Sequence, residues 1–291
     1  MKQLLFFTLF ITLSIILTTR LYAEIQVIDD DQQVVILAET AQRIISLSPS
    51  ITEMLFASGA EKQIIGVVSY SDFPQQAKKI TSVGSYNSLD LEKIINLKPD
   101  LIIAWRSGNP HKQIEKLKLL GYPVFLSEPK NFEDIASNIK RYGLLSGNIK
   151  QSHQQSQLFL TEINKLKQQY KEKAPISVFV QIWDKPIMTI GSQHIISQVI
   201  LLCGGKNIFD SLDITITPDI ESIIQHKPEL ILSTGMANIA TNWLKRWKNW
   251  TMIPAVKNNH LYSTNPDLLV RHSPRLLQGA KNVCQLLDKA R

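Results

Sequence analysis

The sequence predicts an α/β protein with two Rossmann-like lobes, each a parallel sheet flanked by helices, bridged by one long helix, with a ligand cleft between the lobes. Three observations lead to this fold class. Short β-branched runs alternate with helical stretches, which is typical of a parallel sheet covered on both faces. One uninterrupted helical stretch, residues 148–173, separates two such regions. The second region also repeats a segment of the first, so we expect two equivalent lobes.

Residues 1–23 have the order of a secretory signal: Lys2, then a mostly apolar run over 4–17, then Ala23 at the last position before cleavage. The apolar run is shorter than the roughly 20 residues that a membrane span needs. No cysteine lies near the cleavage site to carry a lipid anchor. We expect a soluble periplasmic protein with no stable membrane insertion after cleavage, and an uncleaved N-terminal anchor is the alternative.

In the first lobe, residues 24–147, local stop signals separate the expected elements. Pro49 breaks the first strand, and Pro99 follows the second helix. Gly59 and Gly121 end two helices, because glycine adopts the left-handed conformation that closes a helix. Strands are expected at 43–47, 64–68, 101–104 and 124–126, and helices at 52–58, 89–97 and 112–120.

The bridging stretch, residues 148–173, contains neither glycine nor proline. Its apolar positions at helical spacing are Leu158, Ile163, Leu166 and Tyr170. A single helix of about 24 of these residues is expected, about 36 Å long at 1.5 Å per residue. A strand at 176–182 then opens the second lobe, residues 174–291.

The internal repeat pairs residues 91–103, LEKIINLKPDLII, with residues 220–232, IESIIQHKPELIL, without gaps. The apolar positions of the repeat are expected in the core. Glu92 and Glu221 occupy the same place at the start of a helix in each lobe. A carboxylate there is favoured by the helix dipole alone. The functional alternative is a pair of acidic docking positions, one on each lobe, for a two-fold partner with basic pockets.

Aromatic residues follow several of the expected strands, where ligands of open α/β sheets bind. They are Tyr70, Tyr86, Trp105 and Trp183. Each of them alone fits a partial core position, but four at strand ends favour flat faces lining a shared pocket. Trp243, Trp247 and Trp250 share one helix face instead, and core packing explains them.

Composition and motifs exclude several function classes. The apolar content of 44% is ordinary for a globular protein, and the net charge of +7 is scattered along the chain, so no nucleic-acid partner is expected. The chain has no GxGxxG, GxxxxGK[ST], GxSxG or HExxH motif, and its histidines lack metal-ligand spacing. We therefore expect no metal, no cofactor and no enzymatic activity, and a hydrolase with a scattered triad is a remote alternative.

The two cysteines, Cys203 and Cys284, allow two interpretations. Export places them in an oxidising compartment, which favours a disulfide. Two buried thiols are the alternative.

Several long stretches together resemble the periplasmic vitamin B12-binding proteins of Gram-negative bacteria, the BtuF family of ABC importer components. The resemblance covers nearly all of the chain after the signal. The stretches are RIISLSPSITEMLFASGA, VSYSDFPQQAKKI, LDLEKIINLKPDLIIAWRSGN, VILLCGGKNIF and DLLVRHSPRLLQGAKNVC. The resemblance implies capture of cobalamin, as a transported ligand, in the cleft between the lobes.

The resemblance also implies roles for particular residues. Tyr70 would touch the corrin ring, and Glu92 and Glu221 would dock onto arginines of the two permease subunits, which work with ATPase subunits. Cys203 and Cys284 would form a disulfide. From the second lobe, the loop of Leu268, Leu269, Val270, Arg271 and His272 would contribute to the ligand site.

That loop departs from the best-known members, which carry aromatic and acidic residues before the SPR sequence. The leucine pair still offers apolar contact, and Arg271 and His272 are expected to meet amide or phosphate groups of the ligand. A haem or ferric-siderophore binder of the same fold is the nearest alternative, with Tyr70 or His272 as the axial ligand of haem.

Overall fold

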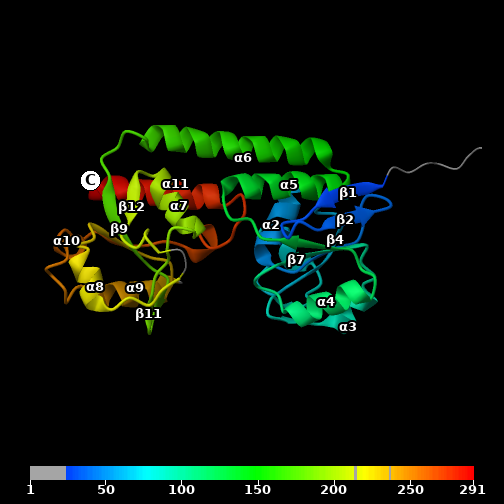
Figure 1. Cartoon of the computed structure of the whole chain (residues 1–291), viewed down its shortest axis with the longest axis horizontal. Coiled ribbons are helices and arrows are strands. Elements are labelled where there is room, and N and C mark those ends of the chain that lie inside the picture. The colour runs from blue at the N-terminus through cyan, green and yellow to red at the C-terminus, as the bar shows by residue number, and fades with distance from the viewer. Residues whose placement is uncertain (1–23, 213–214, 236) are drawn as a thin grey trace, which may run out of the picture.

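The computed structural model contains two α/β lobes joined by a long helix, which confirms the predicted fold class (Figure 1). It describes residues 24–212, 215–235 and 237–291. The expected signal, residues 1–23, lies outside the described residues.

The first lobe is built on a four-stranded parallel sheet in the order β4-β3-β7-β8. Its strands are β3 (Ile44–Ser46), β4 (Ile64–Val67), β7 (Leu101–Trp105) and β8 (Val124–Ser127). Its helices are α2 (Pro49–Ser58), α3 (Leu91–Asn96), α4 (His111–Leu119) and α5 (Phe132–Ser146), with the 3-10 turn η1 (Gln75–Lys79). Every strand and helix expected in this lobe is present, with ends shifted by a few residues.

Local capping explains where the first helix starts and stops. The Ser48 hydroxyl accepts the Ile51 backbone N–H at 3.2 Å, which satisfies one of the free donors of the first turn of α2. Gly59 closes the helix with a φ of 90°. A side chain there would be strained, because only glycine adopts this conformation without penalty.

Besides the short strands between residues 84 and 89 and the turn η1, the sequence did not lead us to expect two elements of this lobe. One is an antiparallel hairpin of β1 (Ile25–Ile28) and β2 (Val34–Leu37), and the other is α5. The signals for α5 are present in the sequence: the Asn131 side chain accepts the Asp134 N–H at 2.7 Å, and Gly147 ends the helix in the left-handed conformation.

The bridging helix α6 (Ile149–Tyr170) packs along both lobes rather than spanning open space (Figure 1). It contacts α2 and α5 in the first lobe and helices of the second lobe at its other end. Its buried apolar residues belong to one continuous core that reaches into both lobes. Ile163, Leu166 and Tyr170 are buried as expected, but Leu158 is half exposed. Phe159 is buried instead, because it lies on the inward face, which repeats every three or four residues.

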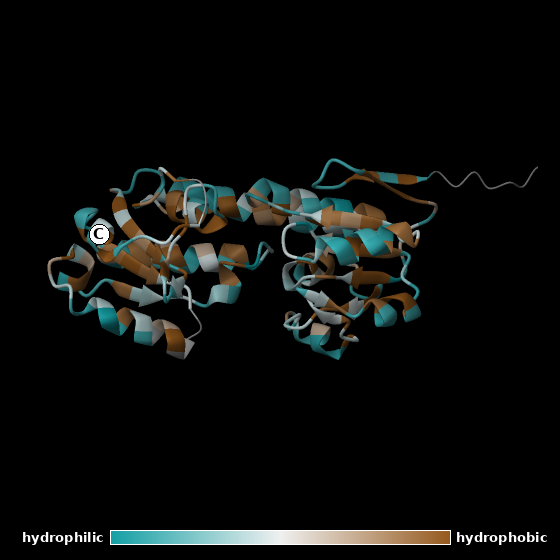
Figure 2. Ribbon diagram, turned by 60° about the horizontal axis from the view of Figure 1, so that its bottom comes forward, coloured by the Kyte–Doolittle hydropathy of each residue, from teal (hydrophilic) through white to brown (hydrophobic). Residues whose placement is uncertain are grey.

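The second lobe repeats the architecture with a parallel sheet in the order β12-β9-β13-β14. Its strands are β9 (Ile176–Gln181), β12 (Gly205–Asn207), β13 (Leu230–Ser233) and β14 (Leu261–Ser263). Its helices are α7 (Ile195–Leu202), α8 (Ile220–Gln225), α9 (Ala237–Trp247), α10 (Pro254–Lys257) and α11 (Leu276–Ala290), with the turn η2 (Pro266–Leu268). Figure 2 shows hydrophobic residues gathered in the middle of each lobe and hydrophilic ones along the outer helices.

The predicted disulfide is present between Cys203 and Cys284. It joins the end of α7 to α11, and both cysteines are fully buried in the core of the second lobe. The predicted core packing is confirmed for Trp243 and Trp247, whose side chains are buried. Trp250 is only partly buried and packs at the margin of the second-lobe core.

Candidate ligand-binding site and docking positions

Two of the predicted aromatic residues lie side by side at the carboxyl end of the first sheet. Trp105 is the last residue of β7, and Tyr86 lies in the turn between the short strands β5 (Gly84–Ser85) and β6 (Ser88–Leu89). Their ring centroids are 5.7 Å apart, with the planes tilted by 46°. This spacing is typical of a favourable aromatic pair, so the two rings form one apolar face.

Asn109 fixes the loops that carry this aromatic pair, and sequence reasoning did not single it out. Its side-chain oxygen accepts the Trp105 N–H at 2.6 Å, and its amide nitrogen donates to Leu47 O at 2.9 Å and Tyr86 O at 2.7 Å. Asn109 is buried, so these bonds satisfy a polar group that would otherwise be costly. One side chain thereby ties the ends of β3 and β7 to the Tyr86 turn.

Tyr70 is the most exposed of the predicted aromatic residues, with 76% of its surface accessible. It lies in the loop after β4 with a φ of 66°, a conformation that is uncommon for a residue with a side chain. Its neighbour Ser71 accepts a hydrogen bond from the Thr52 hydroxyl at 3.1 Å, which ties this loop to α2. An exposed ring on an anchored loop is available to a ligand.

Trp183 lies on the second lobe, at the start of a short hairpin of β10 (Trp183–Asp184) and β11 (Ile187–Met188). Its ring is more than half exposed and packs edge-on against the buried Trp243, with centroids 6.2 Å apart. Asp184 next to it pairs with Arg246 of α9. These contacts hold the exposed indole in place.

The loop after η2 differs from the expectation in its apolar residues. Leu269 has no exposed surface and Leu268 is also buried, so neither leucine side chain is available for the apolar ligand contact that we expected. They pack instead beneath α11, where the Leu268 carbonyl lies against Gly279. Val270 is the exposed apolar residue of this loop.

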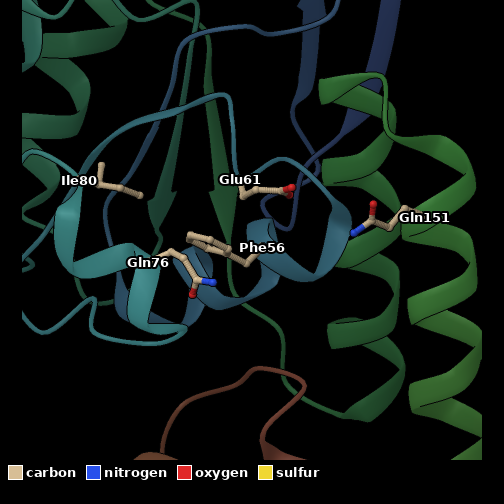
Figure 3. Close-up of a pocket in the computed structure, with 5 residues that line it drawn as sticks. All are labelled: Phe56, Glu61, Gln76, Ile80 and Gln151. Carbon is tan, nitrogen blue, oxygen red and sulfur yellow. The ribbon is translucent and has the colours of Figure 1, made fainter.

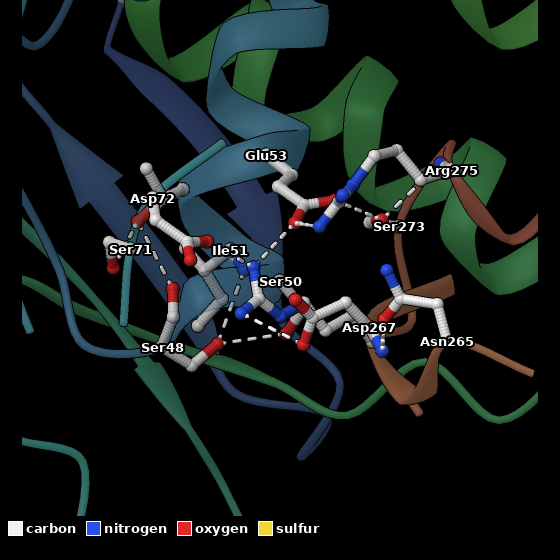
Figure 4. A network of polar contacts seen from close by, with 12 residues as sticks. Ser48, Ser50, Ile51, Glu53, Ser71, Asp72, Asn265, Asp267, Ser273 and Arg275 are labelled. Atoms are coloured by element: carbon white, nitrogen blue, oxygen red, sulfur yellow. Dashed lines mark hydrogen bonds and ion pairs between the residues drawn. The ribbon is translucent and has the colours of Figure 1, made fainter. Parts of the chain in front are cut away.

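Arg271 lies between the lobes in a cluster of charges. Figure 4 labels the other members of this cluster, Glu53, Asp72, Asp267 and Arg275. It pairs with Glu53 at 3.0 Å, Asp72 at 2.8 Å and Asp267 at 3.0 Å. Arg275 pairs with Glu53 at 2.6 Å. We call these five residues the inter-lobe cluster. Glu53 and Asp72 belong to the first lobe and the other three to the second, so the cluster joins residues more than half the chain apart.

Ion pairing favours the charged forms of Asp72 and Arg271. Burial raises the pKa of Asp72, but the hydrogen bond and charge of Arg271 outweigh it, and the pKa of Asp72 is lowered. Burial likewise lowers the pKa of Arg271, but hydrogen bonds to Asp72 and Glu53 outweigh it and the pKa is raised. Both shifts favour the ionised forms.

His272 contacts the first lobe through its ring. Its Nδ1 lies 2.7 Å from the Pro129 carbonyl oxygen, in the loop after β8. Burial lowers the pKa of His272, although this hydrogen bond and the charge of Glu128 oppose the shift. Burial and the neighbouring His272 lower the pKa of His194 to about 4. Both rings therefore favour the neutral form at pH 7.

The two halves of the internal repeat form the same structural unit. Asp90 and Asp219 cap α3 and α8, accepting the N–H of Lys93 at 3.0 Å and of Ser222 at 2.6 Å. Glu92 and Glu221 lie exposed in the first turn of these helices. Figure 1 shows α3 and α8 at the same edge of the molecule, opposite to α6.

Two other pockets lie away from the predicted site residues. One, of about 360 Å³, lies on the first lobe and is lined by Phe56, Glu61, Gln76, Ile80 and Gln151 (Figure 3). A larger one, of about 820 Å³, lies between α6 and α7. None of the predicted ligand-binding residues lines either pocket.

Among the residues that the structure describes, no group of three or more His, Cys, Asp or Glu side chains has the arrangement of a metal site. Within the same part of the chain, no helix has the length and apolar character needed to cross a membrane.

Two α/β lobes bridged by one helix, with exposed aromatic residues at the sheet ends, define the class of bilobed substrate-binding proteins. The chain belongs to the periplasmic binding protein family, which matches residues 44–268. A vitamin B12-binding protein of Yersinia pestis is 35% identical over 250 residues, which cover 85% of this chain and 87% of that protein.

Solved structures of periplasmic binding proteins also match the fold of this chain. The crystal structure of the periplasmic vitamin B12-binding protein BtuF of Vibrio cholerae matches with a TM-score of 0.78 and 37% identity, over 86% of this chain and 98% of that chain. The periplasmic haem-binding protein HutB of Vibrio cholerae matches with a TM-score of 0.75 and 23% identity, over 84% and 98% of the two chains. At that identity the second likeness concerns the fold alone.

Proposed function

We propose that this protein binds cobalamin in the periplasm and delivers it to an ABC importer in the inner membrane. The observation that carries the proposal is the 37% identity with Vibrio cholerae BtuF along 98% of that chain, in the same fold. The vitamin B12-binding protein of Yersinia pestis, 35% identical, supports it. The division into a signal at 1–23, lobes at 24–147 and 174–291 and a bridging helix at 148–173 is part of this proposal.

The exposed rings support a flat, largely apolar ligand. A corrinoid is a broad disc with amide groups around its edge, so aromatic faces hold the disc and polar groups orient it. We assign the faces to Tyr70, Tyr86 and Trp105 on the first lobe and Trp183 on the second. Val270 adds an apolar contact. Arg271 is paired with three carboxylates, and we assign the polar contacts at this edge to the exposed carboxylates of Asp72 and Asp267.

Delivery requires contact with the permease. Glu92 and Glu221 are exposed carboxylates in the first turns of α3 and α8, the two helices that lie on the same edge of the molecule. We assign them to docking on basic pockets of two permease subunits, because a two-fold partner presents the same pocket twice. A single helix packed on both lobes allows little hinge motion, so the permease would release the ligand by separating the lobes through these two contacts.

The test is an equilibrium titration of purified residues 24–291 with cyanocobalamin, with haem as the competitor. Tight one-to-one binding of cyanocobalamin that haem does not displace would support the proposal. Binding of haem in place of cyanocobalamin would overturn the assignment of the ligand and leave the family assignment intact.

A further inference from the structure

Glu53 is a buried carboxylate in a place where the proposed ligand site does not require one. It lies on α2 of the first lobe, and only 2% of its side chain is exposed. A buried charge is costly unless partners compensate it. Every partner that compensates Glu53 comes from the second lobe (Figure 4).

Both oxygens of Glu53 are saturated. Oε1 accepts Arg271 Nη1 at 3.0 Å and Arg275 Nη2 at 2.6 Å. Oε2 accepts Arg275 Nε at 3.0 Å and the Ser273 hydroxyl at 2.5 Å. The Arg275 fork is therefore bidentate, the strongest geometry for a guanidinium and a carboxylate. Its other side lies over the ring of Phe73, 4.1 Å from the centroid, so Arg275 has little freedom to turn toward a ligand.

The charges of the inter-lobe cluster do not cancel. Three carboxylates, from Glu53, Asp72 and Asp267, pair with the two guanidinium groups of Arg271 and Arg275. The arginine side chains are mostly covered: 11% of Arg271 is exposed. The Asp72 and Asp267 side chains are 43% and 37% exposed. The part of the cluster that a ligand meets is therefore carboxylate.

We propose that Glu53 is a positioning residue that determines ligand specificity. It forms ion pairs with Arg271 and Arg275 from the protein interior, so neither arginine is free to bind a ligand. This edge of the ligand site therefore accepts hydrogen bonds from N–H groups and repels carboxylates. The inference rests on the proposed function, because Asp72 lies in the same loop as Tyr70. The ligand class that it selects is a neutral macrocycle with primary amides at its edge. Macrocycles with free propionate groups are disfavoured.

The physical reason is a difference in local charge. With Glu53 ionised, the cluster carries one excess negative charge, and a ligand carboxylate beside Asp72 or Asp267 meets like charge, which weakens binding. An amide at the same place donates hydrogen bonds to these carboxylates. Replacing Glu53 by glutamine keeps the shape but removes the excess charge and frees Arg271 to meet an anion.

The matched probes are cyanocobalamin and its monocarboxylates, each made by hydrolysing one propionamide. They share one macrocycle, so a difference in their dissociation constants reports charge at the edge rather than fit. For the unmodified protein we expect at least one monocarboxylate to bind about tenfold more weakly than cyanocobalamin. For Glu53→Gln we expect this difference to fall below about threefold. A purely structural role for Glu53 would weaken all the probes alike.

Glu61→Gln is the control, because Glu61 is exposed and lies in the pocket of Figure 3, away from the cluster. It should leave the tenfold difference unchanged. If Glu53→Gln does not fold, Asp72→Asn replaces it and should reduce the difference in the same direction. The inference is overturned if the unmodified protein binds every monocarboxylate as tightly as cyanocobalamin, or if the variants keep its full difference. Failure of the unmodified protein to bind cyanocobalamin would instead overturn the proposed function.

Discussion

Glu92 and Glu221 occupy the same position in two copies of one structural unit, one in each lobe. Each lies exposed in the first turn of a short helix that an aspartate caps, and each helix leads into a buried strand. The loops that follow the two helices also match, since Lys98 and Lys227 have φ values of 47° and 46°. The repeat therefore preserves the backbone on which the two glutamates stand.

Reversing both charges, with Glu92→Lys and Glu221→Lys, should abolish cobalamin transport and leave cobalamin affinity unchanged. The reason is that docking on basic pockets requires the carboxylates, whereas both side chains point into solvent, away from the core. Transport is measured with the reconstituted importer in vesicles and affinity by titration. Glu61→Lys with Glu172→Lys, also exposed, is the control pair and should transport normally. A loss of affinity in the test pair would place these glutamates in the ligand site or the fold.

Replacing Tyr70 by asparagine should lower cobalamin affinity by about tenfold or more, because an aromatic face of the proposed site is lost. Asparagine tolerates the positive φ of this position, so the free energy of unfolding should change by less than about 0.5 kcal/mol. Titration and urea unfolding measure the two quantities. Leu119→Asn removes another exposed apolar side chain, on α4, and should leave the affinity unchanged. Unaltered affinity of the Tyr70 variant would remove this residue from the site.

Gly108→Ala should move the Trp105 ring without touching the ligand. A methyl group at Gly108 would lie 1.9 Å from an atom of that ring, so the indole must shift. We expect cobalamin affinity to fall by about tenfold, the effect of roughly 1.4 kcal/mol. Gly121→Asn is the control, because nothing lies within 4 Å of that position and asparagine accepts its positive φ. Equal affinities for the two variants would contradict a ligand contact by Trp105.

Removing the disulfide with Cys203→Ala and Cys284→Ala should lower the free energy of unfolding by about 3 kcal/mol, because the bond closes a long loop in the unfolded chain. The bridged residues are separated by 81 positions. Urea unfolding measures the change, and unfolding of the unmodified protein under reducing conditions should show a similar loss. Superimposable unfolding curves would show that the bond adds nothing to stability. Cobalamin affinity of the folded double variant should not change.

Stability should fall as the pH drops from about 6.5 toward 4. Burial and the nearby His272 lower the pKa of His194 to about 4, so the unfolded chain binds the proton first and is favoured as the pH falls through this window. We expect His194 to account for about 2 kcal/mol of the loss. His194→Asn keeps an acceptor for the Ile196 N–H, which His194 caps in α7. Urea unfolding at a series of pH values should show that the free energy of unfolding of this variant falls less steeply as the pH drops. An unchanged fall would exclude His194 as its source.

Most of the fold follows from local patterns in the sequence. Three local patterns predicted strands and helices that the structure contains: β-branched runs, glycine and proline stops, and the gapless repeat. They succeed because helix capping and the spacing of apolar residues act over only a few residues of chain. The repeat also predicted that Glu92 and Glu221 are equivalent. The helix α5, which we did not expect, had signals of the same local kind, the Asn131 cap and the Gly147 stop.

The site depended on tertiary structure. The sequence placed four aromatic residues at strand ends and marked the loop 268–272, but it did not indicate that Leu268 and Leu269 face the core. Nor did it pair Glu53 with Arg271 and Arg275, which are more than 200 positions away. The sequence by itself determined two repeated α/β lobes, the bridging helix and the equivalent positions of Glu92 and Glu221. Only the folded chain decided which side chains are buried and which charges meet, because the ion pairs arise when the loop before α11 packs against α2 across the two lobes.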